Sequence, residues 1–263
     1  MKVSFTLKRK TAVMAVGILF FVSFICVFAF AFGFSQSPNH EEKAGKSKNT
    51  GVIFQSSTVT ALFERLYSGN ITVDELRRYG GLGVGTYNDF DGELVAVDGE
   101  FYKIDAADGK AYRMPGDAKT PFAIVTHFKA DATHTIEKSM NYSELLRYLD
   151  SLLPSAKIFY AFKINVHFTH VKTRSVFPQK KPYPDLREIM NKQAIFEYKD
   201  IAGYLVGFRY PSHTRCINSP GYHFHFISKD KNKGGHVLVC QTSMKPMKIQ
   251  IHNISRIQMA LPY

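Results

Sequence analysis

The sequence predicts an α+β protein whose second half consists mostly of strands. Its 263 residues are enough for one large domain or two small ones, at about 150 residues per domain. Hydrophobic residues make up 45% of the chain and charged residues 21%, which is typical of a folded globular protein and not of a disordered one. Helical apolar stripes are short, whereas alternating apolar runs fill most of the chain after residue 158. This order favours a mixed fold.

Residues 1–35 are predicted to be a signal peptide or a signal anchor. The stretch 11–34 carries no charged residue, and a helix of that length, at about 1.5 Å per residue, crosses a bilayer core of about 30 Å. Basic residues at 8–10 precede it, which predicts that the rest of the chain lies outside the cytoplasm. The small residues of Ala29-Phe30-Ala31 suit cleavage, so secretion and membrane anchoring both stay open. The polar residues 36–50 indicate a flexible tether.

The first folded part, residues 51–165, is expected to begin with two short helices ahead of its sheet. Apolar residues recur at helical spacing over 59–66. Thr72 with Glu75 three residues later predicts a capping box for the second helix. From 83 to 104, short alternating runs separated by Asp-Gly dipeptides predict a β-meander.

The remaining signals predict alternating strands and helices and then a β-rich domain. Asn141 or Ser143 begins a leucine-rich helix that ends at Pro154. The second part, residues 166–263, is expected to be the β-rich domain and to bind a metal. The other predicted elements are a strand over 121–128, a strand-rich run over 158–176, a short helix over 184–193, and mostly strands from 196 onward.

The net charge of +12, from 34 basic and 22 acidic residues, does not predict a nucleic-acid interface. Four of the basic residues lie within 1–35, which leaves 30 − 22 = +8 for the rest of the chain. Those charges are scattered and form no basic stripe, the usual footprint of nucleic-acid binding. We therefore expect no nucleic-acid partner, and a small acidic substrate suits the charge better.

Three cysteines are too few for a disulfide framework, and Cys26 lies in the leader. Cys216 and Cys240 remain. They could pair in an oxidising compartment or persist as two buried thiols, and the sequence leaves both open.

A histidine cluster is the strongest functional signal. Residues 221–227 alternate strictly, so His223 and His225 are expected on one face of a strand and aromatic residues on the other. A polar stretch and two glycines then let the chain reverse, which places His236 opposite or diagonal to His225. Three imidazoles on neighbouring strands can hold Zn²⁺ with a fourth position open for catalysis. Iron, manganese or nickel would also accept these ligands, and an incidental surface pattern is the alternative interpretation.

Two charged residues are candidates for the same site. Glu93 shares a predicted strand face with Val95 and Val97, where a carboxylate is costly unless it is used or paired. A solvent-exposed glutamate beside a turn is the alternative. Arg174 ends a predicted strand and could clamp a carboxylate through two hydrogen bonds, or it could be a surface arginine.

A series of short motifs occurs in order over residues 55–262. They lie at 85–93, 94–102, 120–123, 171–176, 181–184, 207–209, 220–227 and 234–238. Together they resemble the α-acetolactate decarboxylase family. The resemblance implies a mixed α/β first domain, a β-barrel-like second domain and a homodimer.

The resemblance further implies a zinc enzyme that removes CO₂ from 2-acetolactate, a small anionic 2-hydroxy-3-keto acid, to give acetoin. A bound divalent ion would act as a Lewis acid on the enediolate that remains after CO₂ leaves. The arginine would hold the anionic substrate and, with the glutamate, govern which face is protonated. The residues that match the family's site are the zinc ligands His223, His225 and His236, the catalytic residues Glu93 and Arg174, and Thr86 as part of the pocket wall.

Two departures from the family's pattern bear on activity. In the family, a segment beyond the match to Leu261-Pro262 supplies a second carboxylate to the site. We expect the loss of this carboxylate to weaken proton transfer more than metal binding, because three imidazoles remain. The segment 215–219 differs from the small residues usual in the family, and its thiol, Cys216, could touch the site or only pack. A catalytically silent metal-binding or interaction domain and a zinc hydrolase or hydratase are therefore the alternative functions.

Overall fold

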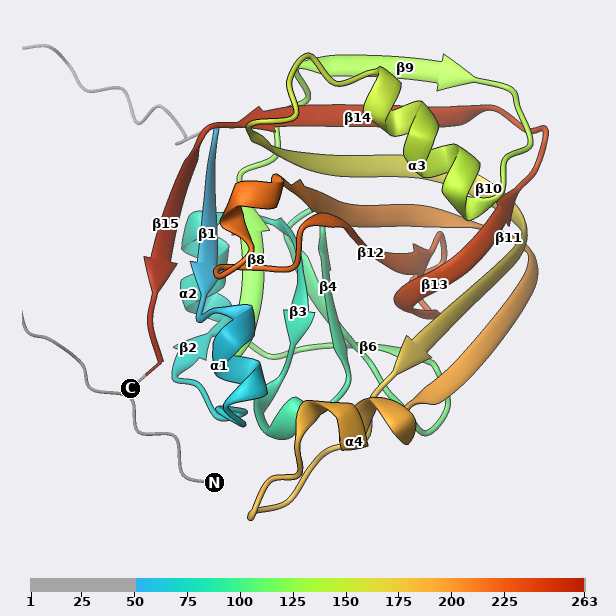
Figure 1. Ribbon diagram of the computed structural model, residues 1–263. Helices are drawn as coiled ribbons and strands as arrows, with labels where there is room; N and C mark the ends of the chain where they lie inside the picture. The colour runs from blue at the N-terminus through green and yellow to red at the C-terminus, as the bar shows by residue number, and fades with distance from the viewer. Residues whose placement is uncertain (1–50, 263) are drawn as a thin grey trace, which may run out of the picture. The chain divides into compact units, whose positions relative to one another are not determined.

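The computed structural model describes residues 51–262 (Figure 1). The leader predicted over 1–35 and the tether predicted over 36–50 lie outside the described residues, so both stay predictions. Of the helices within 51–262, none is both long enough and apolar enough to cross a bilayer. All described residues belong to one compact unit.

The first sheet is mixed and has the strand order β15-β1-β8-β3-β4-β5-β6. β1 and β15 pair in parallel, whereas the other neighbours are antiparallel. The strands are β1 (Val52–Ser56), β3 (Leu82–Thr86), β4 (Glu93–Val97), β5 (Glu100–Ile104), β6 (Ala111–Arg113), β8 (Phe122–Thr126) and β15 (Arg256–Ala260). A short ribbon of β2 (Ile71–Thr72) and β7 (Lys119–Thr120) stands apart.

The second sheet is antiparallel and is built on two long strands, β10 and β11, which pair from Tyr160↔Arg209 to Ser175↔Ala194. The opposite edge of β10 pairs with β14 along its first half and with β13 along its second half. Because β12 joins β11 to β13, the pairings among β10, β11, β12 and β13 close a ring. The strands are β9 (Ala132–Ile136), β10 (Phe159–Ser175), β11 (Ala194–Tyr210), β12 (Gly221–Ser228), β13 (Gly234–Thr242) and β14 (Met247–Ile254).

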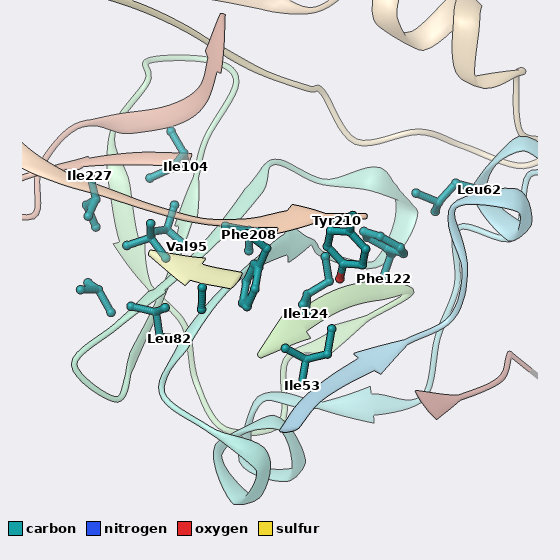
Figure 2. Packing of buried hydrophobic residues seen from close by; sticks show 14 of the residues in the cluster. Ile53, Leu62, Leu82, Val95, Ile104, Phe122, Ile124, Phe208, Tyr210 and Ile227 are labelled. Carbon is teal, nitrogen blue, oxygen red and sulfur yellow. The ribbon is translucent and has the colours of Figure 1, made fainter. Parts of the chain in front are cut away.

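The central core lies between the two sheets. Alternation along β4 directs Val95 and Val97 into it and Leu94 and Ala96 to the opposite face. Figure 2 shows side chains from both sheets meeting in this layer, including Val95 from the first sheet. The others that it labels from these strands are Ile53, Leu82, Ile104, Phe122 and Ile124 of the first sheet and Phe208, Tyr210 and Ile227 of the second. A charged group carried inward between these sheets is therefore removed from water.

Four short α-helices border the sheets. Thr72 accepts a hydrogen bond from the Glu75 backbone at 3.2 Å, and its own N–H donates to the Glu75 carboxylate at 2.7 Å, which confirms the predicted capping box. Asn141 and Glu144 cap the leucine-rich helix in the same way. The α-helices within 51–262 are α1 (Val59–Phe63), α2 (Val73–Tyr79), α3 (Tyr142–Ser151) and α4 (Leu186–Asn191); short 3-10 turns occupy Asn88–Phe90 and Ser212–Thr214.

The α+β class and the β-meander are confirmed, but the start of the chain differs from the prediction. β1 precedes α1, so a strand and not a helix opens the fold. The helix predicted over 59–66 ends at Phe63, and Phe63 and Leu66 are exposed. β1 was missed because it pairs with β15, which is about 200 residues away, and no local pattern reports that contact.

The boundary expected between residues 165 and 166 falls inside β10, which runs without a break. The sheets also exchange segments across that boundary. β15 comes from the second predicted domain and joins the first sheet, whereas β9 comes from the first and joins the second sheet. The barrel-like character of the second part stays a prediction.

The two cysteines of the described chain do not form a disulfide. Cys216 is exposed, Cys240 is buried, and both thiols are free. Neither of the two possibilities that the sequence left open, a disulfide or two buried thiols, is found, because both thiols are free and Cys216 lies on a surface loop.

Candidate active site

The β12–β13 hairpin places all three predicted metal ligands together. His223 and His225 are two residues apart on β12, so both side chains face the first sheet. The intervening Phe224 lies on the opposite face and packs with α3. The chain reverses after β12, and His225 and His236 become direct cross-strand partners. The predicted juxtaposition of the three histidines is confirmed.

The three imidazoles converge closely enough to share one cation. His223 Nε2 is 3.1 Å from His225 Nε2 and 3.1 Å from His236 Nδ1, and the candidate ligand atoms all lie within 4.8 Å of one another. Nitrogens bound to one tetrahedral zinc at about 2.0–2.1 Å are separated by about 3.3 Å, so the observed spacing fits a common ion.

The protonation of the cluster also suits a cation. The Nδ1–H of His225 donates a hydrogen bond to the carbonyl oxygen of Leu94 at 2.7 Å. The Nε2 of the same ring therefore carries a lone pair, which is directed at the other two imidazoles. Burial lowers the pKa of His223 to about 4 and the pKa values of His225 and His236 well below the ordinary range. Three neutral imidazoles with converging lone pairs, of which His225 is fully buried and the other two are half-buried, form a set of donors that a divalent cation satisfies.

Glu93 reaches this cluster from the first sheet. It is only 6% exposed, and its Oε2 lies 3.4 Å from His225 Nε2. Loss of water raises the pKa of Glu93 to about 7, although the positive charge of Arg174 acts in the opposite direction. The predicted strand face shared with Val95 and Val97 is thus confirmed, and the carboxyl is buried rather than solvated.

Arg174 lies on β10 directly opposite His236 of β13. Its Nε is 3.9 Å from Glu93 Oε1, which is an electrostatic contact and too long for a hydrogen bond. Its guanidinium also contacts the sulfur of Met190 on α4. Because neither contact is a two-pronged salt bridge, the planar donors can still receive a carboxylate.

A cavity of about 400 Å³ opens between the sheets at this point. Glu93, Arg174, His223 and His236 line it. Thr86 lines it as predicted, but its hydroxyl donates to the Gly92 carbonyl at 2.7 Å, so that side chain supports the wall. The rest of the wall is mainly apolar and comes from Val59, Leu62, Phe63, Gly85, Phe90, Phe122, Leu186, Met190 and Tyr222, with Asn218 and Ser219.

Several of these wall residues escaped the sequence analysis. Asn218 and Ser219 sit in the loop before β12, where polar residues give no signal beyond closeness to the metal strand. Met190 and Leu186 form part of a helical stripe that reads as ordinary core packing. Cys216, which was a candidate contact, is exposed and is not part of the cavity wall.

The fold and the site together define an α+β protein with a cluster of three histidines, spaced as the ligands of one metal ion would be, beside a cavity that also holds one carboxyl and one guanidinium group. Residues 53–263 match the family described as alpha-acetolactate decarboxylase. The chain therefore belongs to the alpha-acetolactate decarboxylase family, whose curated members are carboxy-lyases by name.

Individual relatives agree with this assignment. The alpha-acetolactate decarboxylase of Methanosarcina mazei is 46% identical over 187 residues, 71% of this chain and 65% of the relative. That of Methylococcus capsulatus is 42% identical over 210 residues, 80% of each chain. The crystal structure of alpha-acetolactate decarboxylase from Bacillus subtilis strain 168 superposes with a TM-score of 0.77 at 36% identity and covers 80% of this chain and 89% of its own.

Proposed function

We propose that this chain removes CO₂ from 2-acetolactate and releases acetoin. The observation that carries the proposal is the convergence of the three imidazoles with Glu93 and Arg174 on one cavity. Membership of the family supports the reaction, and the residues that line the cavity support the roles proposed for them below. The substrate is a small anion with a hydroxyl beside a carbonyl.

His223, His225 and His236 are proposed to hold a zinc ion. When it is bound, the ion supplies a Lewis acid that stabilises the negative charge developing on the substrate oxygens. The backbone carbonyl of Leu94 fixes the tautomer of His225 through its Nδ1–H, as outer-shell partners of ligand histidines commonly do. The first sheet therefore takes part in building the ligand set.

Arg174 is proposed to bind the substrate carboxylate before CO₂ leaves. Its side chain is only 17% exposed, so a charge pair formed there is weakly screened by water. The neighbouring thioether of Met190 is a weak acceptor and competes little for the guanidinium donors. When the bond to the carboxylate breaks, CO₂ leaves as a neutral molecule, and the electron pair and its negative charge pass to the enediolate that remains.

Glu93 is proposed to deliver the proton that converts the enediolate to acetoin. A carboxyl with a pKa of about 7 can both hold and release a proton near neutral pH. Its position on one wall of the cavity limits protonation to one face of the planar intermediate. Stereoselective acetoin follows from that placement.

The three imidazoles, the Glu93 carboxyl and the Arg174 guanidinium around an open cavity support catalysis over a silent metal-binding or interaction domain. Export or membrane anchoring through the leader 1–35, and assembly into a homodimer, are part of the same proposal. Export rests on the apolar stretch 11–34 and its basic flank, and the homodimer rests on the family resemblance.

The proposal is tested by measuring zinc content, CO₂ and acetoin on one purified sample of the full-length chain supplied with racemic 2-acetolactate. H223A is expected to lose both zinc and acetoin formation. H213A changes an exposed histidine of the Ser212–Thr214 turn and is expected to keep both. Equal rates in wild type and H223A would remove the proposed function, and full zinc occupancy without turnover would favour the silent domain.

A further inference from the structure

The backbone of β13 contains a bulge just after His236. Between β10 and β13 the register shifts, because Lys172 faces Val239 but the next residue, Thr173, faces Val237. One extra residue on β13 produces this bulge. As a result His236 lies in register with both Arg174 and His225. Holding this path in place is therefore a requirement for the histidine cluster.

The residues before His236 cannot hold the path by themselves. Gly234 and Gly235 have no side chains, and Gly235 adopts a φ of +136°, a conformation that glycine tolerates but does not enforce. A Cβ on Gly235 would lie 2.6 Å from the Arg174 carbonyl and 2.8 Å from Thr173 Cβ. The glycine backbone thus packs directly against β10.

Thr173 supplies the hydrogen bond at this contact. Its side chain is fully buried, and its hydroxyl donates to the Gly234 carbonyl at 2.9 Å. The hydroxyl of Tyr198 lies farther from the same carbonyl, at 3.4 Å, and also contacts the carbonyl of Gly109 at 3.2 Å. Thr173 therefore makes the shorter side-chain contact to the peptide just before the ligand-bearing segment.

We propose that Thr173 is a positioning residue for the metal site, and that its hydroxyl fixes the Gly234 carbonyl so that His236 stays within reach of His223 and His225. The inference rests on the proposed metal site. Thr173 itself touches neither the ion nor the substrate. Its effect passes through two peptide groups of β13, and its loss should widen the range of positions that the His236 ring samples.

The test compares the zinc dissociation constant of full-length wild type with those of T173V and T173S, using zinc alone in competition with a chromophoric chelator. T173V keeps the shape and removes the hydroxyl, and it should bind zinc about tenfold more weakly, in the range found when outer-shell partners are lost. T173S restores a hydroxyl and should bind within about twofold of wild type.

Thr126 provides a matched control. It is a fully buried strand threonine whose hydroxyl donates to the Val52 carbonyl at 2.8 Å in the first sheet, and it is not part of the cavity wall. T126V loses an equivalent hydrogen bond and should be destabilised similarly, but its zinc affinity should remain that of wild type. A general loss of stability would affect T173V and T126V alike.

The inference is overturned if T173V binds zinc as tightly as wild type, or if T173S binds as weakly as T173V. Should T173V fail to fold, T173A is measured in its place with the same expected weakening. Wild type that binds no zinc would refute both the metal site and this role, whereas wild-type binding with no difference in T173V would refute this role alone.

Discussion

Replacing Glu93 with glutamine tests the burial of this carboxyl with little change of shape. In protein from which metal has been removed with a chelator, we expect E93Q to be more stable than wild type at pH 8. The reason is desolvation, because a carboxylate that is 6% exposed has lost most of its water, and the charge of Arg174 compensates only in part.

The magnitude follows from the pKa of Glu93, which rises from an ordinary 4.5 to about 7. The pKa difference is 7 − 4.5 = 2.5. Because one pKa unit is equivalent to about 1.36 kcal/mol, this difference corresponds to about 3 kcal/mol of unfolding free energy. Because the pKa of the folded state is the higher one, the folded protein holds the proton more tightly than the unfolded chain. The unfolding free energy of wild type should therefore fall by this amount as the pH rises from about 4.5 to 7, and it should not fall further above pH 7. Glutamine does not titrate, so the unfolding free energy of E93Q should not show this dependence on pH.

The assay is denaturant or thermal unfolding of both apo proteins at pH 5, 6, 7 and 8. At pH 8 the melting temperature of E93Q should exceed that of wild type by about 6–12 °C, since about 1 kcal/mol corresponds to 2–4 °C for a chain of this size. At pH 5 the difference in free energy should be below about 1 kcal/mol.

E197Q serves as a control, because the pKa of Glu197 is shifted in the opposite direction from that of Glu93. Glu197 is exposed, and hydrogen bonds from Lys172 and His170 lower its pKa. Its contribution is present above the ordinary pKa and is lost as the pH falls, so E197Q should not be stabilised at pH 8. An E93Q protein that is no more stable than wild type at pH 8, or a difference independent of pH, would refute the burial of Glu93.

Three further outcomes follow from the same site and core. R174K should lower kcat/KM by on the order of 100-fold, mainly through KM, because an ammonium cannot form the two-pronged bond to a carboxylate; steady-state kinetics with acetolactate checks it. G235A should cost about 1–3 kcal/mol of unfolding free energy, because the residue has a positive φ and packs against β10. In native protein a thiol reagent should modify the exposed Cys216 rapidly, and the buried Cys240, whose pKa burial raises to about 12, only on unfolding.

The sequence predicted the parts of the site that local alternation controls. The strict alternation over residues 221–227 determines that His223 and His225 share a face, and the following glycines predict the return that brings His236 alongside. Glu93 was placed on an apolar face by the same rule. What the sequence did not predict depends on contacts between distant segments, such as the pairing of β1 with β15 and the position of Asn218 in the cavity wall. Single-sequence patterns carry no signal for such contacts.

The exchange of strands between the two sheets has a consequence for catalysis. Glu93 belongs to the first sheet and the three histidines to the second, so the site depends on how the two sheets are fixed together. Two features fix them: strands β9 and β15 cross between the predicted halves, and the Leu94 carbonyl of the first sheet accepts the Nδ1–H of His225. A hinge between two independent domains would let the Glu93–His225 distance of 3.4 Å vary. The chain crossings and the hydrogen bond between Leu94 and His225 restrain that motion, and the carboxyl is thereby held beside the histidine cluster before substrate arrives.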